Sequence, residues 1–314
     1  MGYAPGRMQT IRQLAGVLPA LVTPLHYDGS FDAQGSRAVV RRCLDAGVDG
    51  LLTLGSTGEM ASLPEAVGRA QVETVVDEAA GRAPVLMGVA QVSLQRAVED
   101  IQFAQRAGVA AVLVTPPYYT PIDQETVAGW YRSLHASCPD MPLLVYNIPG
   151  FTKVSVDPRV MASLAEDGVV AGTKDSSRDY DHLCDVLVAT RHVAGFRVFT
   201  GSDQQLLGSL AMGAAGTIAA SVNVAPSWAV RILHAFREGD WSTAQRFQDE
   251  QIRLNQMLRA GVFPSGHKAA LEVLGVCQRW MAAPTPSASD ATVERLRGQL
   301  SALGLLSIKE PVPA

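Results

Sequence analysis

The chain contains 314 residues, of which 47% are hydrophobic, and it carries a formal net charge of -4. This length and composition suit one large α/β barrel, or two ordinary domains, with a sizeable buried core. The acidic balance, together with the absence from the sequence of a lysine- and arginine-rich run, argues against nucleic acid or an anionic membrane surface as a partner.

The four cysteines are widely separated along the sequence. They form no Cys-x-x-Cys pair, and no histidines stand at the spacing of metal ligands, so the sequence predicts neither a zinc site nor a disulfide framework. The opening stretch MGYAPGRMQT lacks the apolar segment of a signal peptide, and no apolar run is long enough to span a bilayer. We therefore expect a cytoplasmic protein with reduced thiols and no metal.

Short apolar runs recur along the chain, and several directly follow a helical pattern that ends in glycine. Examples are DAGVDGLLTLG, RAGVAAVLVTP and AMGAAGTIAAS. Glycine can adopt the left-handed conformation that closes a helix, and the apolar run after it is typical of a buried strand. The predicted strands span residues 17–23, 51–54, 85–89, 112–115, 143–146, 169–173, 198–200 and 217–220.

Amphipathic segments separate the predicted strands. Four of them begin at residues suited to cap a helix, namely Asp32, Ser62 with Glu65 three residues later, Ser93 and Asp123. From Pro226 onward the pattern is helical, with helices predicted over 228–238, 241–259 and 266–280.

Eight strands that each precede a helix predict an α/β protein, a (β/α)8 TIM barrel with a C-terminal helical extension. An open doubly wound sheet is the alternative, but no Gly-x-Gly-x-x-Gly follows the first strand. We expect an N-terminal arm at residues 1–16, a catalytic barrel at 17–225, and a C-terminal helical domain with a tail at 226–314.

Functional residues of such a barrel stand where its strands end. These positions hold GSTGE at 55–59, TPPYY at 115–119, YNIPG at 146–150, and Lys174 after the sixth strand. An ε-amine can lose its proton and attack a carbonyl, which a guanidinium cannot do. The other three lysines, Lys153, Lys268 and Lys309, lie in a loop, on a late helix and in the tail. Lys174 alone is predicted to point into the barrel mouth.

Each of these features also has an ordinary explanation. Lys174 fits a solvated lysine beside Asp175, and GSTG fits a common glycine-rich turn. Tyr118 and Tyr119 fit packing aromatics at an interface, and Tyr146 fits a core tyrosine that makes one hydrogen bond. Their shared position at strand ends favours a common site instead.

Taken together, the motifs resemble those of the pyruvate-dependent class I aldolases and lyases, the dihydrodipicolinate synthase and N-acetylneuraminate lyase superfamily. GSTGE, TPPYY, YNIPG and GTKDS arrive in the order of that family, and the resemblance runs from PALVTP at 19–24 to FPSGHKAALEVLG at 263–275. It implies that Lys174 forms a Schiff base with pyruvate or another 2-oxo acid, whose iminium acts as the electron sink, so that no separate cofactor is needed.

The resemblance implies roles for three more catalytic residues. Tyr146 would shuttle protons to and from the carbinolamine, and Thr57 would relay them. Tyr119 would be lent by a neighbouring subunit, so we expect a homodimer, or a homotetramer built as a dimer of dimers.

The resemblance also implies a set of substrate-binding residues. Ser56 and Thr57 would hold the pyruvate carboxylate with their N–H and hydroxyl groups. Gly201 and Ile218 would line the pocket near the imine. Phe151 stands where dihydrodipicolinate synthases carry the arginine that grips the carboxylate of aspartate semialdehyde, and a phenyl ring cannot pair with a carboxylate. Lys153 and Arg178 are the cations close enough in sequence to take the place of this arginine.

The sequence leaves several reactions open. Gln204 and Ala220 replace the acidic residue and serine with which sialic acid lyases bind a sugar tail, whereas KDSS resembles members that cleave 2-keto-3-deoxy sugar acids or 4-hydroxy-2-oxo acids. We therefore expect an aldolase or lyase that acts on a 2-keto-3-deoxy sugar acid or a 4-hydroxy-2-oxo acid. The alternatives are a 4-hydroxy-tetrahydrodipicolinate synthase, a dehydratase that uses the same imine, and a non-catalytic paralogue that binds a keto acid.

Overall fold

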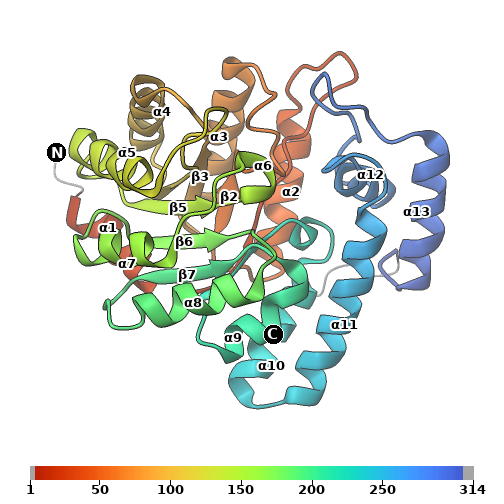
Figure 1. Cartoon of the computed structure of the whole chain (residues 1–314). Coiled ribbons are helices and arrows are strands. Elements are labelled where there is room, and N and C mark those ends of the chain that lie inside the picture. The colour runs from red at the N-terminus through yellow and green to blue at the C-terminus, as the bar shows by residue number, and fades with distance from the viewer. Residues whose placement is uncertain (1–3, 307–314) are drawn as a thin grey trace.

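The computed structural model describes residues 4–306 of the chain and shows one sheet ringed by helices (Figure 1). All strand pairs in the sheet are parallel. The strands are β1 (Gly16–Pro19), β2 (Leu51–Thr53), β3 (Val85–Val89), β4 (Ala111–Val114), β5 (Leu143–Asn147), β6 (Gly172–Asp175), β7 (Arg197–Thr200) and β8 (Gly216–Ala219).

The sheet closes into a barrel. Neighbouring strands follow the order β1-β8-β7-β6-β5-β4-β3-β2, so the first and last strands of the chain pair with each other. The remaining seam is closed just beyond β1, where Ala20 bridges Leu52 in parallel and the Leu21 N–H donates to the Leu52 carbonyl over 2.8 Å. The predicted (β/α)8 architecture is confirmed.

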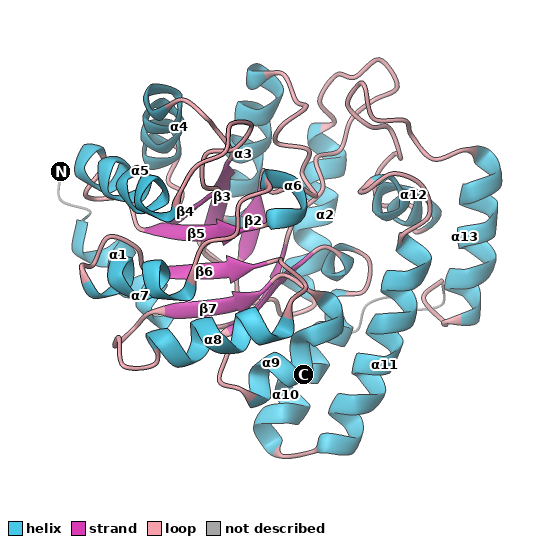
Figure 2. Cartoon of the chain, in the orientation of Figure 1, coloured by secondary structure: helices cyan, strands magenta, loops and turns pink. Residues whose placement is uncertain are grey.

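Helices cover the outside of the barrel and continue past its last strand (Figure 2). The α-helices are α1 (Ala4–Gln13), α2 (Ala33–Asp45), α3 (Glu65–Ala79), α4 (Leu94–Arg106), α5 (Gln124–Ser137), α6 (Pro149–Thr152), α7 (Pro158–Glu166), α8 (Tyr180–Thr190), α9 (Leu206–Ala211), α10 (Pro226–Glu238), α11 (Trp241–Leu258), α12 (Ser265–Val273) and α13 (Asp290–Ala302). Two 3-10 helices, η1 (Asp203–Gln205) and η2 (Ser221–Asn223), follow β7 and β8.

Three of the predicted helix caps form. The side chains of Asp32, Ser93 and Asp123 each accept a hydrogen bond from the backbone N–H three residues later. The cap predicted at Ser62 is wrong, because α3 begins after Pro64, which caps without a side-chain bond.

The core is layered as expected for a filled barrel. Leucines of alternate strand positions, including Leu18, Leu52, Leu86 and Leu144, are packed inside the barrel. Ile11 belongs to the same interior cluster, so α1 closes the amino-terminal end of the barrel within the segment predicted as an arm. Two further apolar clusters fill the space between the strands and the surrounding helices.

Strand β6 starts three residues later than predicted. The N–H groups of Val169 and Val170 both donate to the Leu164 carbonyl and close α7, whereas Ala171 N–H makes the first bond to the neighbouring strand, at Leu143. Lys174 therefore lies within β6 and not behind it. A strand residue has its side-chain direction fixed by the sheet, which a loop residue does not.

The C-terminal helices α11, α12 and α13 lie on the side of the barrel toward which its strands point (Figure 1). The helix predicted over 266–280 ends at Val273, because Gly275 takes the left-handed conformation at a φ of 72° and turns the chain. Helix α12 thereby stays short.

Candidate active site

A cavity of about 400 Å³ lies where the strands end, and Lys174 lines it. One wall comes from strand ends and the loops after them, including Ser56, Tyr146 and Gly201. The opposite wall comes from the C-terminal helices and includes Asn255 and His267. The site residues predicted from the sequence that line this cavity all belong to the first wall.

Lys174 is held by its two neighbouring strands. It lies beside Tyr146 of β5 and Phe199 of β7 in the sheet register, and it is only 4% exposed. Its Nζ donates to the Tyr146 Oη over 3.4 Å and stands 4.5 Å from the centre of the tyrosine ring. The amine thus lies against the ring and hydroxyl of a single phenol, that of Tyr146.

Gly201 leaves the space that the lysine side chain occupies. A Cβ at this position would stand 1.9 Å from Ser176 Oγ and 2.9 Å from Lys174 Cε. Any other residue would push these atoms aside, so glycine is required for steric reasons. Ile218, fully buried on β8, lines the same cavity. Gly201 and Ile218 both line the cavity that holds Lys174.

A hydroxyl extends the contact chain from Lys174 through Tyr146. Ser56 Oγ lies 3.1 Å from Tyr146 Oη. The sequence-based expectation gave the relay to Thr57, whose side chain is 3% exposed and also lines the cavity. The hydroxyl in hydrogen-bond contact with the phenol in this structure is that of Ser56.

The turn that carries Ser56 is fixed by close backbone packing. A Cβ on Gly88 of β3 would stand 2.0 Å from the Leu54 carbonyl oxygen, so only glycine lets the turn lie against β3. Within residues 4–306, the backbone N–H groups of Ser56 and Thr57 donate no hydrogen bond. Two such groups at a cavity suit an anionic oxygen.

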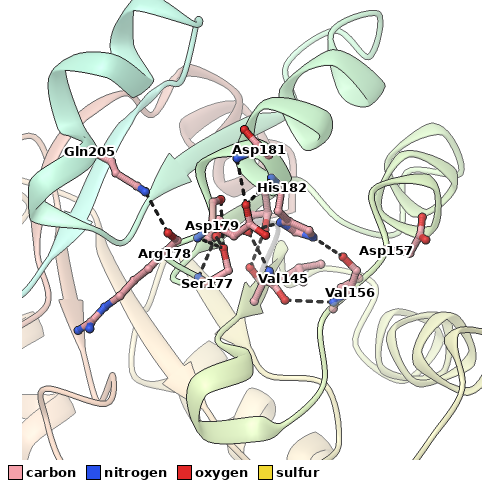
Figure 3. Close-up of polar contacts among 12 residues, drawn as sticks. Val145, Val156, Asp157, Ser177, Arg178, Asp179, Asp181, His182 and Gln205 are labelled. Atoms are coloured by element: carbon pink, nitrogen blue, oxygen red, sulfur yellow. Dashed lines mark hydrogen bonds and ion pairs between the residues drawn. The ribbon is translucent and has the colours of Figure 1, made fainter.

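Asp175 follows Lys174 in β6, but its carboxylate belongs to a separate polar cluster, of which Ser177 and His182 are labelled in Figure 3. It accepts from His182 Nδ1 and from Asn147 Nδ2, each over 2.8 Å, and from Ser177 N–H over 2.9 Å. Burial opposes the charge, but these hydrogen bonds outweigh it and lower the pKa of Asp175.

His182 lies between two acceptors. Its Nε2 is 3.0 Å from the Val156 carbonyl, and its Nδ1 faces the Asp175 carboxylate. Since neither partner donates, both ring nitrogens must, and the histidine is held as the imidazolium. The hydrogen bond that His182 donates to Asp175 accordingly raises the pKa of His182 against the effect of burial. The charge of Asp175 is thus neutralised on the side away from Lys174.

A second buried lysine pairs with the loop after β2. Lys268 of α12 is fully buried, and its Nζ stands 2.8 Å from Glu59 Oε1. Glu59 Oε2 accepts from the Ala282 N–H over 2.7 Å. This ion pair ties the GSTGE turn to the C-terminal helices.

Two aromatic residues predicted in the site differ in their placement, because Phe151 lines the cavity and Tyr119 does not. Tyr119 is 95% exposed in the loop after β4 and has a φ of 84°, an uncommon conformation for a non-glycine residue. Phe151 is 60% exposed and lines the cavity, with its ring 6.2 Å from that of Phe263.

The two nearby cations differ in their placement. Arg178 lines the cavity, and its guanidinium points away from the Asp175 cluster in Figure 3. Lys153 Nζ donates to the Gly150 carbonyl over 2.8 Å. Arg178 is therefore the better placed of the two to meet a substrate carboxylate.

Asp203 is a buried acid on the far side of the cavity. It accepts from Ser221, Gln251 and Asn255, which join η1 to η2 and α11. Burial raises the pKa of Asp203, although the hydrogen bonds from Ser221 and Gln251 partly offset this.

Among residues 4–306 no three His, Cys, Asp or Glu side chains stand together as a metal site. No helix of that range is long and apolar enough to cross a membrane.

A model of the dihydrodipicolinate synthetase family matches residues 13–303. The chain belongs to this family. The 4-hydroxy-tetrahydrodipicolinate synthase of Phenylobacterium zucineum is 35% identical to it over 292 residues, which cover 93% of this chain and 98% of that relative.

Two solved structures of the dihydrodipicolinate synthase family share the fold over 93% of this chain and 99% of their own. The synthase of Thermotoga maritima is 30% identical with a TM-score of 0.89. A prophage protein of this family from E. coli K12, solved in complex with pyruvate, is 28% identical with a TM-score of 0.89. Family members are class I lyases that hold pyruvate on a lysine, so this protein is an enzyme of the same class.

Proposed function

We propose that Lys174 forms the imine with pyruvate or another 2-oxo acid and that Tyr146 and Ser56 move the protons. The contact chain from Lys174 Nζ through Tyr146 Oη to Ser56 Oγ, inside the cavity, carries this proposal. Ser56 takes the relay that the sequence gave to Thr57, because its hydroxyl is the one that contacts the phenol.

The chemistry follows from these positions. The neutral Lys174 amine attacks the keto carbon, and the Tyr146 phenol protonates the carbinolamine hydroxyl, which leaves as water. The N–H groups of Ser56 and Thr57 hold the carboxylate. The Tyr146 phenolate that this loss of water leaves takes a proton from the methyl carbon of the iminium and gives the enamine. The enamine attacks the carbonyl carbon of an aldehyde, whose oxygen takes that proton from Tyr146 and becomes a hydroxyl. The reverse sequence breaks the same carbon–carbon bond.

The relatives favour condensation of pyruvate with aspartate semialdehyde as the reaction. The Phenylobacterium zucineum relative, like the one of Methanopyrus kandleri at 34% identity, is a 4-hydroxy-tetrahydrodipicolinate synthase. For this reaction Arg178 is the candidate to hold the aldehyde's carboxylate, since it lines the cavity.

A second candidate function is favoured by Phe151. This ring stands at the cavity where an arginine would serve the synthase, and it packs on Phe263. An apolar rim suits cleavage of a 2-keto-3-deoxy sugar acid or a 4-hydroxy-2-oxo acid, or a dehydration through the same imine, because these reactions need no second carboxylate clamp.

Two assays separate the candidates. Consumption of aspartate semialdehyde with pyruvate is compared with pyruvate release from 2-keto-3-deoxygluconate and from 4-hydroxy-2-oxopentanoate, neither of which has a second carboxylate. If the protein is a synthase, the first assay is the faster and Arg178→Ala raises the KM for the semialdehyde. If Phe151 sets the substrate, the second is faster, and Phe151→Arg improves the semialdehyde reaction.

Tyr119 completes the proposal as a residue given to a neighbouring copy in a dimer or a dimer of dimers. Its exposure and its constrained backbone fit a side chain held out for a partner. Tyr119→Phe should lower kcat without unfolding the protein, and turnover equal to that of the wild type would refute the shared site.

A further inference from the structure

His267 lies in the first turn of α12, on the wall of the cavity that the C-terminal helices provide. Its side chain is 3% exposed, and it shares the cavity with Lys174. The barrel wall supplies the lysine and tyrosine, whereas this histidine comes from a helix outside the barrel.

Neither ring nitrogen of His267 has a hydrogen-bond partner within residues 4–306. Buried polar side chains in proteins are nearly always bonded, so the missing partner must be supplied from the cavity. The Pro264 carbonyl lies near enough to the ring to offset the effect of burial on its pKa in part, but it forms no hydrogen bond of ordinary geometry with either nitrogen. His267 thus lines the cavity without a hydrogen-bond partner for either buried nitrogen, so a substrate group that enters the cavity is the candidate to supply one.

The surroundings of the ring keep it uncharged. Phe263 contacts the imidazole edge-on at a centroid distance of 5.3 Å, and Phe263 in turn packs on Phe151. Burial lowers the pKa of His267 to about 4. Besides Lys174, the charged groups that share the cavity are Asp203, which accepts from Asn255, and Arg178 and Arg259, which are both exposed.

A neutral imidazole offers one N–H donor and one acceptor nitrogen. A hydroxyl group both donates and accepts, so it can satisfy either nitrogen without bringing charge into the site. A carboxylate accepts only and would add a charge beside two phenylalanine rings, where desolvation is costly.

We propose that His267 binds a hydroxyl group on the carbon partner of the pyruvate imine and thereby selects hydroxylated substrates. The proposal rests on the imine at Lys174 and deepens it, because it names the substrate class that the second half of the cavity accepts. His267 then sets specificity and takes no part in the chemical steps at Lys174.

The test compares two aldehydes that differ in hydroxylation. Condensation with pyruvate is measured with glyceraldehyde and with propanal, and the ratio of the two kcat/KM values is the readout. We expect the wild type to favour glyceraldehyde, and His267→Leu to lower this ratio by about tenfold or more through loss of the glyceraldehyde rate alone. His267→Asn, which keeps a donor and an acceptor, should retain part of the preference.

Borohydride trapping of pyruvate on Lys174 accompanies each variant and separates two kinds of failure. An adduct with an unchanged ratio in His267→Leu overturns the role of His267 and leaves the imine proposal standing. No adduct in the wild type overturns both. If His267→Leu does not fold, His267→Phe replaces it, since a ring of similar size fills the same space, and an unchanged ratio there is equally decisive.

Discussion

The chain buries two lysines at the carboxyl end of the barrel, and their amines have different partners. Lys268 is paired with the Glu59 carboxylate at 2.8 Å. Lys174 has a neutral phenol at 3.4 Å as its hydrogen-bond partner, and no carboxylate of residues 4–306 forms an ion pair with it. Lys174 lines the large cavity, whereas Lys268, which follows His267 in α12, is fully buried and does not line it.

The difference shows that burial alone does not make a reactive lysine. Burial lowers the pKa of Lys268 despite the attraction of Glu59, yet this amine is enclosed and bonded to its carboxylate. A nucleophile needs access to the substrate and a free electron pair. Lys174 has the access, and the one carboxylate next to it in sequence, Asp175, is turned away to His182.

Replacing Lys174 should give the largest effect. Lys174→Met removes the nucleophile, and we expect kcat to fall by at least about 10,000-fold. Stability should change by less than about 1 kcal/mol, because no buried carboxylate is left unpaired. Steady-state kinetics and urea unfolding measure the two quantities. Appreciable turnover by this variant would exclude an imine at Lys174.

Replacing Lys268 should have the opposite pattern. Lys268→Met leaves Glu59 charged and buried without its partner, which costs about 3–5 kcal/mol of unfolding free energy. The double variant Lys268→Met, Glu59→Gln should recover much of this loss, because the stranded charge is gone. Urea unfolding measures both. A single variant as stable as the wild type would mean that the ion pair contributes nothing to the fold.

The hydroxyl next to Tyr146 can be identified by a smaller effect on rate. Ser56→Ala should lower kcat by about 10- to 100-fold because a proton relay is lost, and Ser56→Thr should restore most of it. Thr57→Ser, which keeps the hydroxyl, is the matched control. If Thr57→Ala alone slowed the reaction to this extent, the relay would belong to Thr57 after all.

The ion pair of His182 and Asp175 should make the stability of the protein depend on pH. The pKa of His182 is raised above its ordinary 6.5, so its contribution is fully present below about pH 6.5 and is lost as pH rises through the raised value. Asp175, whose pKa is lowered from 3.8, contributes above that pH and loses its effect as pH falls through the lowered value.

We therefore expect His182→Phe to cost about 1–3 kcal/mol at pH 6 and distinctly less at pH 9.5. The exposed pair of His192 and Glu166 supplies the control, since His192→Phe should change stability by less than about 1 kcal/mol at either pH. An equal loss for His182→Phe at both pH values would show that the imidazolium is not the form that holds Asp175.

Much of this site follows from the sequence because the barrel orders it. Glycines and apolar runs mark the strands, and their ends bring Lys174, Tyr146, Gly201 and Ile218 to one cavity. Local rules are sufficient here, since a parallel barrel gathers all its carboxyl strand ends at one face.

The remaining features depend on backbone detail and tertiary packing. Ser56 and Thr57 are adjacent hydroxyls, and only the turn against Gly88 decides which of them meets Tyr146. The hydrogen bonds of Val169 and Val170 to the Leu164 carbonyl close α7, so β6 begins three residues later than the sequence predicts. His267 faces the cavity because α12 lies opposite the strand ends. The segment FPSGHKAALEVLG carries part of the family resemblance, but its sequence pattern does not distinguish a histidine that lines a cavity from one that packs in the core.

The most direct test of the account is the mass of the protein after incubation with pyruvate and borohydride, followed by peptide mapping of the modified lysine. The account predicts one reduced adduct, at Lys174, and none at Lys268 or Lys153. An absent adduct, or one carried by another lysine, would contradict it.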